Sequence, residues 1–365
     1  MRITSSLTKA LTPTAVALGN FDGVHRGHQQ VIAPVLKTKQ ESLAKRLEER
    51  GDRVEVKSLN RLVTYASEHT YATVVTFNPH PQEFFTGKRR TLLTPLQEKA
   101  QQLESLGVEQ LVLLPFDREL AALSPQEFVE KILVQQLHVQ QISVGEDFCF
   151  GRQRSGTASD LKVIAATFNI PVTIIPLHYF ASDSPQETLR ERISSSCIRQ
   201  ALEQGDLPRA QTLLGRPYTL TGCVVKGQQL GRTIGFPTAN IQLPPEKFLP
   251  RQGVYAVRVF IEDESRRGSG VAGGAGEEVI SLSLASHSPY IGVINIGCRP
   301  TVNGTQPSVE VHLLDWSGDL YGQTLTVQLE KFLRPEQKFA SLEALKAQIQ
   351  ADCDLAQSVL MESVL

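Results

Sequence analysis

The chain has 365 residues, of which 41% are hydrophobic, and its 37 lysines and arginines nearly balance its 38 aspartates and glutamates. This length exceeds what one hydrophobic core usually organises, so we expect two domains. The balanced charge gives no overall basic field, which argues against nucleic acid or an anionic membrane surface as a partner.

Five cysteines are scattered along the chain without a CxxC pair. This pattern argues against a zinc site and a disulfide framework, and it fits a reducing cytoplasm. The N-terminal segment lacks the apolar region of a signal peptide, and no apolar run is long enough to span a bilayer. We therefore expect a soluble cytoplasmic protein. The sequence does not indicate an oligomeric state.

The most informative stretch is GNFDGVHRGH, residues 19–28, which follows the apolar run 14–18 and opens a helical pattern at Gln29. Glycines let a backbone approach an anion closely, and the first amides of a helix favour negative charge. His25 and His28 present two imidazoles that can donate hydrogen bonds to phosphoryl oxygens. The stretch therefore indicates a phosphate site, although two polar loop histidines would also account for an HxGH match alone.

The next segments alternate between short β-rich runs and capped helical patterns. After the helix that begins at Gln29, dense mixed charge in residues 37–70 indicates an insertion that forms a solvated surface helix and loop. The alternation predicts a doubly wound parallel sheet, in which ligands gather at the carboxyl ends of the strands. The further expected strands are 72–77, 110–114, 141–144 and 172–175, and the further expected helices begin at Thr94 and Ser124.

Two loops at those strand ends carry candidate ligand residues. His80 lies between two prolines that restrict its backbone, and this position suits a structural turn residue as well as a ligand contact. In GEDFCFG, residues 145–151, Phe148 and Phe150 offer faces for stacking a planar ring, although aromatic residues are more often part of a core. Asp147 in the same loop offers hydrogen-bond acceptors. We therefore favour an arrangement in which Phe148 packs inward and Asp147 hydrogen-bonds a ligand.

A serine-rich stretch, RISSSCIRQALEQGD, opens another helix, whose N-terminus the serines would cap. After residue 215 the pattern changes to short alternating strands with Gly/Pro turns, which predicts a separate antiparallel barrel or sandwich over about 218–330. The strands 253–260 and 291–296 are expected to pair. The Gly- and Ser-rich segment between them, residues 262–288, is expected to be a disordered hairpin insertion.

Two blocks of the second domain carry chemistry. In GQQLGRTIGFPTAN, three glycines form a loop able to close over phosphates, and the Thr238 and Asn240 oxygens point the same way from an extended segment. Hard oxygens suit Mg²⁺ on nucleotide phosphates, although Thr and Asn beside glycine also form ordinary turns. In VEVHLLDW, alternation places Glu310 and His312 on one face. A carboxylate there can accept a proton from an attacking alcohol, or simply face solvent.

The C-terminal stretch predicts a flap followed by an amphipathic helix, whose face would contain Leu342, Leu345 and Ile349 and would close the barrel. Neither a Walker P-loop nor protein-kinase motifs occur in the sequence.

Together these blocks resemble the bacterial bifunctional riboflavin kinase/FAD synthetase family. The resemblance covers nearly the whole chain and is carried by GNFDGVHRGH, TFNPHP, VGEDFCFG, ISSSCIR, GRTIGFPTAN and VEVHLLD. It implies a Rossmann-like nucleotidyltransferase domain at 1–185, a helical linker at 186–217 and a riboflavin-kinase-like β-barrel with a C-terminal helix at 218–365. The implied reactions are phosphorylation of riboflavin by ATP to FMN, and adenylylation of FMN by ATP to FAD with release of pyrophosphate.

The resemblance also implies residue roles. Catalysis falls to Glu310, His25 and His28, and Mg²⁺ binding to Thr238 and Asn240. Flavin binding falls to His80, Asp147, Phe148 and Phe150. FMN and FAD are then substrate and products rather than prosthetic groups. The family's ISSTxIR threonine is Ser196 here, which keeps the hydroxyl. ATP phosphate binding falls to Gly19, Asn20, Phe21, Asp22, Gly23, Ser195, Ser196, Arg199, Gly227, Gly231 and Gly235.

Two other functions remain open on the residues. An HxGH adenylyltransferase for another substrate would leave the PTAN block and its barrel unexplained. A flavin-sensing regulatory protein could keep both folds without turnover, but the presence of His25, His28, Asn240 and Glu310 argues against it.

Overall fold

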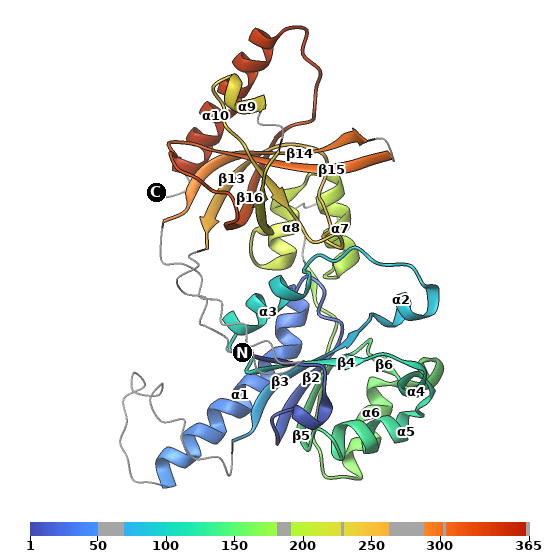
Figure 1. Cartoon of the computed structure of the whole chain (residues 1–365). Coiled ribbons are helices and arrows are strands. Elements are labelled where there is room, and N and C mark those ends of the chain that lie inside the picture. Colours follow the sequence, from blue (N-terminus) through green and yellow to red (C-terminus); the bar gives the residue numbers. More distant parts are fainter. Residues whose placement is uncertain (50–68, 181–190, 228–229, 263–287, 302–303, 363–365) are drawn as a thin grey trace. The chain divides into compact units, whose positions relative to one another are not determined.

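The computed structural model describes residues 1–49, 69–180, 191–227, 230–262, 288–301 and 304–362 (Figure 1). These residues divide into two compact units. The first contains Met1–Arg90 and Lys99–Arg192, and the second contains Thr91–Glu98 and the described residues from Ile193 onward. Each unit is a separate fold.

The first unit is built around a parallel sheet with the order β1-β4-β3-β2-β5-β8, in which every neighbouring pair is parallel. The predicted doubly wound sheet is therefore confirmed, and β1 is a strand that the sequence patterns did not predict. The strands of this unit are β1 (Arg2–Thr4), β2 (Thr14–Leu18), β3 (Tyr71–Asn78), β4 (Gln110–Pro115), β5 (Val139–Gly145), β6 (Cys149–Phe150), β7 (Gly156–Thr157), β8 (Val172–Ile175), β9 (Tyr179–Phe180) and β10 (Glu191–Arg192).

Helices cover both faces of this sheet. They are α1 (Arg26–Glu49), α2 (Pro81–Thr86), α3 (Leu96–Ser105), α4 (Arg118–Ala122), α5 (Pro125–Glu127) and α6 (Ala158–Ala166), with a π-helical stretch at Phe128–Val134 and 3-10 turns at Leu7–Lys9 and Arg152–Arg154. The division between the two units falls within α3, between Glu98 and Lys99.

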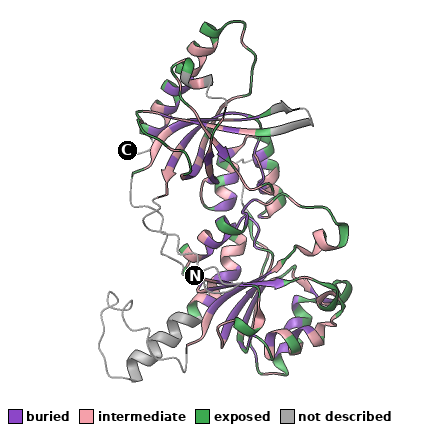
Figure 2. Cartoon of the chain, viewed as in Figure 1, coloured by how far each residue is buried: buried purple, intermediate pink, exposed green. Residues whose placement is uncertain are grey.

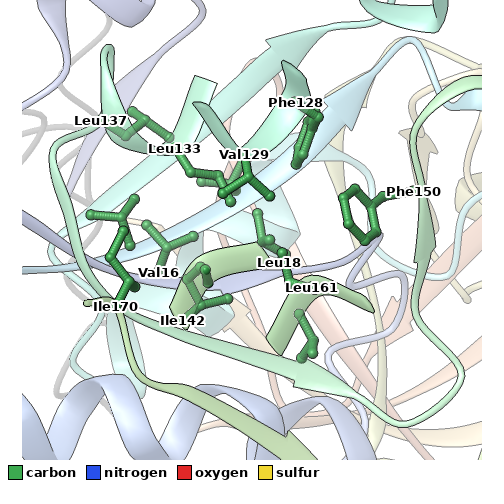
Figure 3. Packing of buried hydrophobic residues seen from close by; sticks show 14 of the residues in the cluster. Val16, Leu18, Phe128, Val129, Leu133, Leu137, Ile142, Phe150, Leu161 and Ile170 are labelled. Carbon is green, nitrogen blue, oxygen red and sulfur yellow. The ribbon is translucent and has the colours of Figure 1, made fainter. Parts of the chain in front are cut away.

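Alternate residues of the central strand β2 belong to two different hydrophobic clusters. Val16 and Leu18 pack with the π-helical stretch and α6, as Figure 3 shows for the labelled side chains. Ala15 and Ala17 belong to the cluster that includes residues of α1 and α3. Because successive side chains of a strand point to opposite faces, an apolar run without polar alternation is buried on both sides. Figure 2 shows the resulting band of buried residues along the sheet.

The strand order reverses at β2. The chain proceeds from β2 to β3 and β4 on one side, then returns to place β5 and β8 on the other. In open α/β sheets, the crevice beyond the carboxyl ends of the strands at such a reversal is the usual ligand site. The loops that follow β2 and β5 both lie there, and these are the loops that the sequence identified.

The second unit is a closed antiparallel barrel with the order β11-β12-β15-β14-β13-β16. Its inner positions are apolar, including Ile294, Val311 and Val327, which are almost fully buried. The predicted barrel and its β13–β14 pairing are confirmed. Its elements are β11 (Tyr218–Val225), β12 (Ala239–Gln242), β13 (Gly253–Ile261), β14 (Tyr290–Thr301), β15 (Gly304–Leu313), β16 (Thr324–Arg334), α7 (Ser195–Gln204), α8 (Leu207–Leu214), α9 (Leu230–Thr233) and α10 (Leu342–Glu362).

The C-terminal helix α10 is present, and Ile349 of its predicted face packs against the barrel, but the contact continues further along the helix than the prediction placed it. Leu342 is 49% exposed, whereas Cys353, Ala356 and Leu360 pack on the barrel beside Val254 and other residues of β13 and β14. The apolar spacing at the start of the helix resembles the later spacing, so the sequence pattern did not show which turns meet the barrel. Only the C-terminal half of the helix supplies the main contact.

Other helix details also differ from the sequence patterns. The helix α1 begins at Arg26 rather than Gln29, because His25 already caps its N-terminus. The helix expected after Ser124 becomes π-helical from Phe128, although Phe128 and Leu133 are buried as the periodicity indicated. The later part of the 37–70 insertion and the 262–288 segment fall almost entirely outside the described residues. None of the helices in the described ranges is long and apolar enough to cross a membrane.

A buried ion pair holds the segment Thr91–Glu98 in the second unit. Lys247 Nζ donates to Glu98 Oε2 at 2.5 Å and to the Leu93 carbonyl oxygen at 2.8 Å. Both charged side chains are at most 4% exposed. Burial raises the pKa of Glu98, and the positive charge of Lys247 opposes that rise. The carboxylate therefore depends on the lysine to remain ionised.

Replacing Lys247 by methionine should destabilise the second unit by about 3–5 kcal/mol, because breaking a buried pair from one side leaves an uncompensated charge. Urea unfolding of the full chain, followed by circular dichroism, measures the change. The exposed Lys331 on β16, changed to methionine, is the matched control and should alter stability little. Adding Glu98→Gln to the Lys247 variant should restore part of the loss, and an unchanged unfolding midpoint in the single variant would show that the pair is dispensable.

Candidate functional site

The loop after β2 leads directly into α1 and is held in an unusual conformation. Phe21 and Val24 have positive φ values of 50° and 42°, in the left-handed region that costs a side chain about 1–3 kcal/mol. Both side chains are nearly fully buried. A Cβ at Gly19 would lie 3.2 Å from the Phe21 ring, so any larger residue there would require the ring to shift slightly. Phe21 can therefore serve a ligand only through its backbone.

The backbone of the same loop is anchored to the sheet and to α3. The Gly19 N–H donates to the Val75 carbonyl oxygen at 3.2 Å. The Asn20 carbonyl oxygen accepts from Thr76 Oγ1 at 3.1 Å and from Lys99 Nζ at 2.9 Å. Asp22 is only 9% exposed. These contacts keep the strained loop in one conformation at the carboxyl end of β2.

The two histidines of the loop lie against each other. The rings of His25 and His28 stack, with centroids 3.6 Å apart and planes 15° from parallel. His25 Nδ1 accepts from the backbone N–H of His28 at 3.3 Å. An accepting Nδ1 leaves the proton on Nε2, so His25 retains a donor for a phosphoryl oxygen. The pair thus combines helix capping with an anion-binding geometry.

The loop after β3 makes His80 a capping residue. Its Nδ1 accepts from the Gln82 N–H at 3.1 Å, and Glu83 accepts from the His80 N–H at 3.2 Å, which forms a capping box at the start of α2. Burial, followed by the positive charge of Arg90, lowers the pKa of His80 to about 4. The imidazole is therefore neutral at pH 7. His80 therefore has the structural role in the turn that the sequence allowed, and its contact with a flavin stays a prediction.

The loop after β5 divides the residues that the sequence grouped together. Phe150 is only 4% exposed and packs on Phe128 in the core, with ring centroids 5.6 Å apart. Phe148 is partly buried against the same cluster. Asp147 is exposed, and Arg192 forms an ion pair with it. Asp147 is thus the accessible member of this loop, whereas Phe150 belongs to the core, and a ligand contact of Asp147 stays a prediction.

The predicted second phosphate clamp lies at the N-terminus of α7, in the second unit. Ser194 caps the helix by accepting from the Cys197 N–H, so Ser195 and Ser196 are the first two helical residues. Arg199 donates to the Thr91 carbonyl oxygen at 3.1 Å. Its guanidinium carbon lies 5.7 Å from the centre of the Phe248 ring. A role of these residues toward ATP stays a prediction.

The barrel brings together the three residues expected to act in the second unit. β12 and β15 pair so that Asn240 lies opposite Glu310, and directly opposed residues share one face. Thr238 Oγ1 donates to Glu310 Oε2 at 3.2 Å, and Ser308 Oγ donates to Glu310 Oε1 at 3.1 Å. His312 Nδ1 lies 2.7 Å from the Pro237 carbonyl oxygen and so links the same wall to the PTAN segment.

Two glycines of the preceding loop are needed for close approach to this wall. A Cβ at Gly227 would overlap the Asn240 carboxamide. At Gly231 a Cβ would overlap the Phe236 carbonyl oxygen and lie 3.3 Å from Thr238 Oγ1. Gly235 has a φ of 91°, which favours glycine. The segment around Gly231 forms the short helix α9 rather than a purely irregular loop.

The hydroxyl oxygen of Thr238 and the carboxamide oxygen of Asn240 are hard donors that fit Mg²⁺ shared with nucleotide phosphates, and the Glu310 carboxylate lies beside them. The glycines at 227 and 231 let the loop backbone pack closely against Asn240 and the PTAN segment. Within the described ranges, no cluster of three or more His, Cys, Asp or Glu side chains is arranged to hold a metal ion.

Three residues at these sites were missed by the sequence patterns. Lys99 is a charged residue in a helix and belongs to none of the motifs, but its ammonium group donates to the Asn20 carbonyl oxygen in the loop after β2. Ser308 could have been found, because it is two residues before Glu310 on the same strand face. Arg192 lies 45 residues from Asp147 in sequence, and no local pattern joins them.

Comparison with known proteins separates the same two regions. The FAD synthetase family model matches residues 7–47 and 57–189, and the riboflavin kinase family model matches residues 214–360. A bifunctional riboflavin kinase/FMN adenylyltransferase of Escherichia coli (strain K12) is 38% identical, with 92% of this chain and 90% of that protein covered. The chain belongs to this bifunctional family.

Other relatives agree. The bifunctional riboflavin kinase/FMN adenylyltransferases of Pseudomonas fluorescens and Bacillus subtilis (strain 168) are 38% and 34% identical, and the alignments cover at least 90% of each chain. Among solved structures, one described as a macrolide-efflux protein from Streptococcus pneumoniae aligns with a TM-score of 0.74 and 28% identity, covering 97% of this chain and 98% of that one. Riboflavin kinase/FMN adenylyltransferase family members thus match both units of the chain.

Proposed function

We propose that this chain makes FMN and FAD in two ATP-dependent steps. The second unit phosphorylates riboflavin, and the first unit adenylylates the FMN that results. The observation that carries the proposal is the convergence of Thr238, Asn240 and Glu310 on one barrel wall, in a chain that also holds the HxGH loop at a strand-order reversal. The proposed domains are 1–185 for adenylylation and 218–365 for phosphorylation, with the linker 186–217 between them.

In the first step, Glu310 is the general base. Its carboxylate accepts the proton of the ribityl 5′-hydroxyl while that oxygen attacks the γ-phosphorus of ATP, and the bond to the ADP oxygen breaks. The hydroxyls of Thr238 and Ser308 donate to its two oxygens and so keep the carboxylate in place. Thr238 and Asn240 would hold Mg²⁺, which when bound neutralises charge on the nucleotide phosphates. Gly227, Gly231 and Gly235 let the loop approach those phosphates.

In the second step, an FMN phosphate oxygen attacks the α-phosphorus of ATP, and pyrophosphate leaves. No proton has to be removed from the nucleophile, because the phosphate is already ionised. His25 and His28 donate hydrogen bonds to the phosphoryl oxygens as their charge grows, beside the amides of Gly19–Gly23 and the N-terminus of α1. The contribution of the protein is mainly orientation and electrostatics.

The remaining proposals concern the residues that contact the flavin and the ATP phosphates, and the cellular compartment. His80 and Asp147, which follow the carboxyl ends of β3 and β5, and Phe148 in the loop of Asp147 are proposed to contact the flavin. Ser195, Ser196 and Arg199 are proposed to bind ATP phosphates. All five cysteines are thiols, which fits a reducing compartment, and we place both reactions in the cytoplasm.

Incubation of the purified chain with riboflavin and Mg-ATP, followed by chromatography, tests the proposal. FMN should appear first and FAD second. The same assay with FMN in place of riboflavin should yield FAD directly. Riboflavin that is retained unchanged would indicate a flavin-binding regulator instead, and phosphorylation without FAD formation would remove the second activity.

A further inference from the structure

A buried lysine in the first unit has no role in the two reactions described above. Lys99 lies on α3 and is only 9% exposed. Lysines are rarely buried, because loss of water disfavours the ammonium form. Burial accordingly lowers the pKa of Lys99, and the negative charge of Asp22 opposes that change. The partners of the ammonium group therefore belong to the loop that follows β2.

Lys99 contacts one loop of the candidate adenylylation site, and its charge acts on a second loop. Its Nζ donates to the Asn20 carbonyl oxygen at 2.9 Å. Its charge also helps to lower the pKa of His80, whose other charged neighbours are Arg90, Glu83 and Asp22. Lys99 thus contacts the GNFDG loop at the carboxyl end of β2 and acts through its charge on the Pro-His-Pro loop that follows β3.

A hydrogen bond to Asn20 does not by itself explain a buried charge at this position. Thr76 Oγ1 already donates to the same carbonyl oxygen at 3.1 Å, so that oxygen would keep a partner without the lysine. What Lys99 adds, when it is protonated, is a positive charge behind a loop in which Phe21 and Val24 have strained backbones. In a site with little water such a charge acts more strongly than at the surface.

We propose that Lys99 is a positioning residue for adenylyl transfer: it fixes the Asn20 carbonyl, and thereby orients the loop amides and histidines toward the ATP phosphates. The inference rests on the proposed adenylyltransferase function. Lys99 touches no reacting atom. Its effect passes through the loop, so its loss should change the turnover number for FAD formation rather than flavin binding.

The test compares Lys99→Met with Thr76→Val, which removes the neutral hydrogen bond to the same carbonyl oxygen, and with Lys162→Met, an exposed lysine on α6. The assay follows FAD formation from FMN and ATP, with riboflavin phosphorylation by the same sample as an internal control. Lys99→Met should lower kcat for FAD formation by about 10²-fold, because a misplacement of roughly 1 Å costs that much. The KM for FMN should stay near its original value, and so should the rate of riboflavin phosphorylation.

Thr76→Val should lower kcat by a much smaller factor, and Lys162→Met should leave it unchanged. Lys99→Arg, which keeps the charge, should recover more activity than Lys99→Gln, and this pair gives the answer if the methionine variant does not fold. Equal losses in Thr76→Val and Lys99→Met, or equal activity of the arginine and glutamine variants, would overturn the role of the charge. Absence of FAD formation in the unaltered chain would instead contradict the proposed function.

Discussion

Replacing Glu310 by glutamine should nearly abolish riboflavin phosphorylation while FAD formation from supplied FMN continues. Glutamine keeps the size of the side chain and can still hydrogen-bond with Thr238 and Ser308, but its amide cannot accept the hydroxyl proton. General-base steps contribute roughly 10²- to 10⁴-fold in rate, so the loss should fall in that range. Adenylylation starts from an ionised phosphate in a different compact unit and needs no such base.

The measurement is product analysis of the Glu310 variant, once with riboflavin and once with FMN, beside a circular-dichroism check of folding. Glu343→Gln, on the exposed start of α10, is the matched control and should keep both activities. Loss of both activities in a folded Glu310 variant would contradict independent sites. Unimpaired riboflavin phosphorylation would remove Glu310 from the mechanism.

Replacing His28 by alanine should have the opposite result, with FMN accumulating and little FAD formed. The substitution removes a hydrogen-bond donor aimed at the charge that develops on the phosphoryl group, and it removes the ring that stacks on His25. The loss of one preorganised donor lowers the rate by about 10²- to 10³-fold. Phosphorylation of riboflavin in the same sample should be unaffected.

A suitable control for the His28 variant is His69→Ala. His69 lies two residues before β3, at its amino end, and its Nε2 contacts Glu109 at 3.0 Å. That end of the sheet is opposite to the end where the site loops lie, so FAD formation should be retained. A His28 variant that makes FAD at the original rate would show that the HxGH loop has been assigned wrongly.

Much of the fold could be predicted from local patterns. Apolar runs such as 14–18 and 72–77 indicated parallel strands buried on both faces, and both are strands of the central sheet. Alternation in VEVHLLDW placed Glu310 and His312 on one face, and the buried Val309, Val311 and Leu313 occupy the other. These predictions succeed because the two-residue period of a strand is a local property.

The site of the second unit was also largely predictable, because its residues fall in two short blocks. The spatial relation between the two blocks could not be predicted from the sequence patterns. Asn240 and Glu310 are 70 residues apart, and they face each other only because β12 and β15 pair in one particular register. A shift of one residue would have turned Glu310 into the barrel interior. Resemblance to a family supplied this relation, where periodicity alone could not.

By itself, therefore, the sequence determined most of the segments that form strands and which strand faces are apolar, and it indicated which loops are candidates for phosphate binding. The tertiary structure alone decided the strand order that places the loops after β2 and β5 together, the burial of Phe150 in the core, and the contact of Lys99 with Asn20. The physical reason is that periodicity reports how one element meets its surroundings, whereas partners between elements depend on contacts over long sequence separations. The helical pattern around Lys99 cannot show that the residue is buried, because its burial depends on a loop that is distant in sequence.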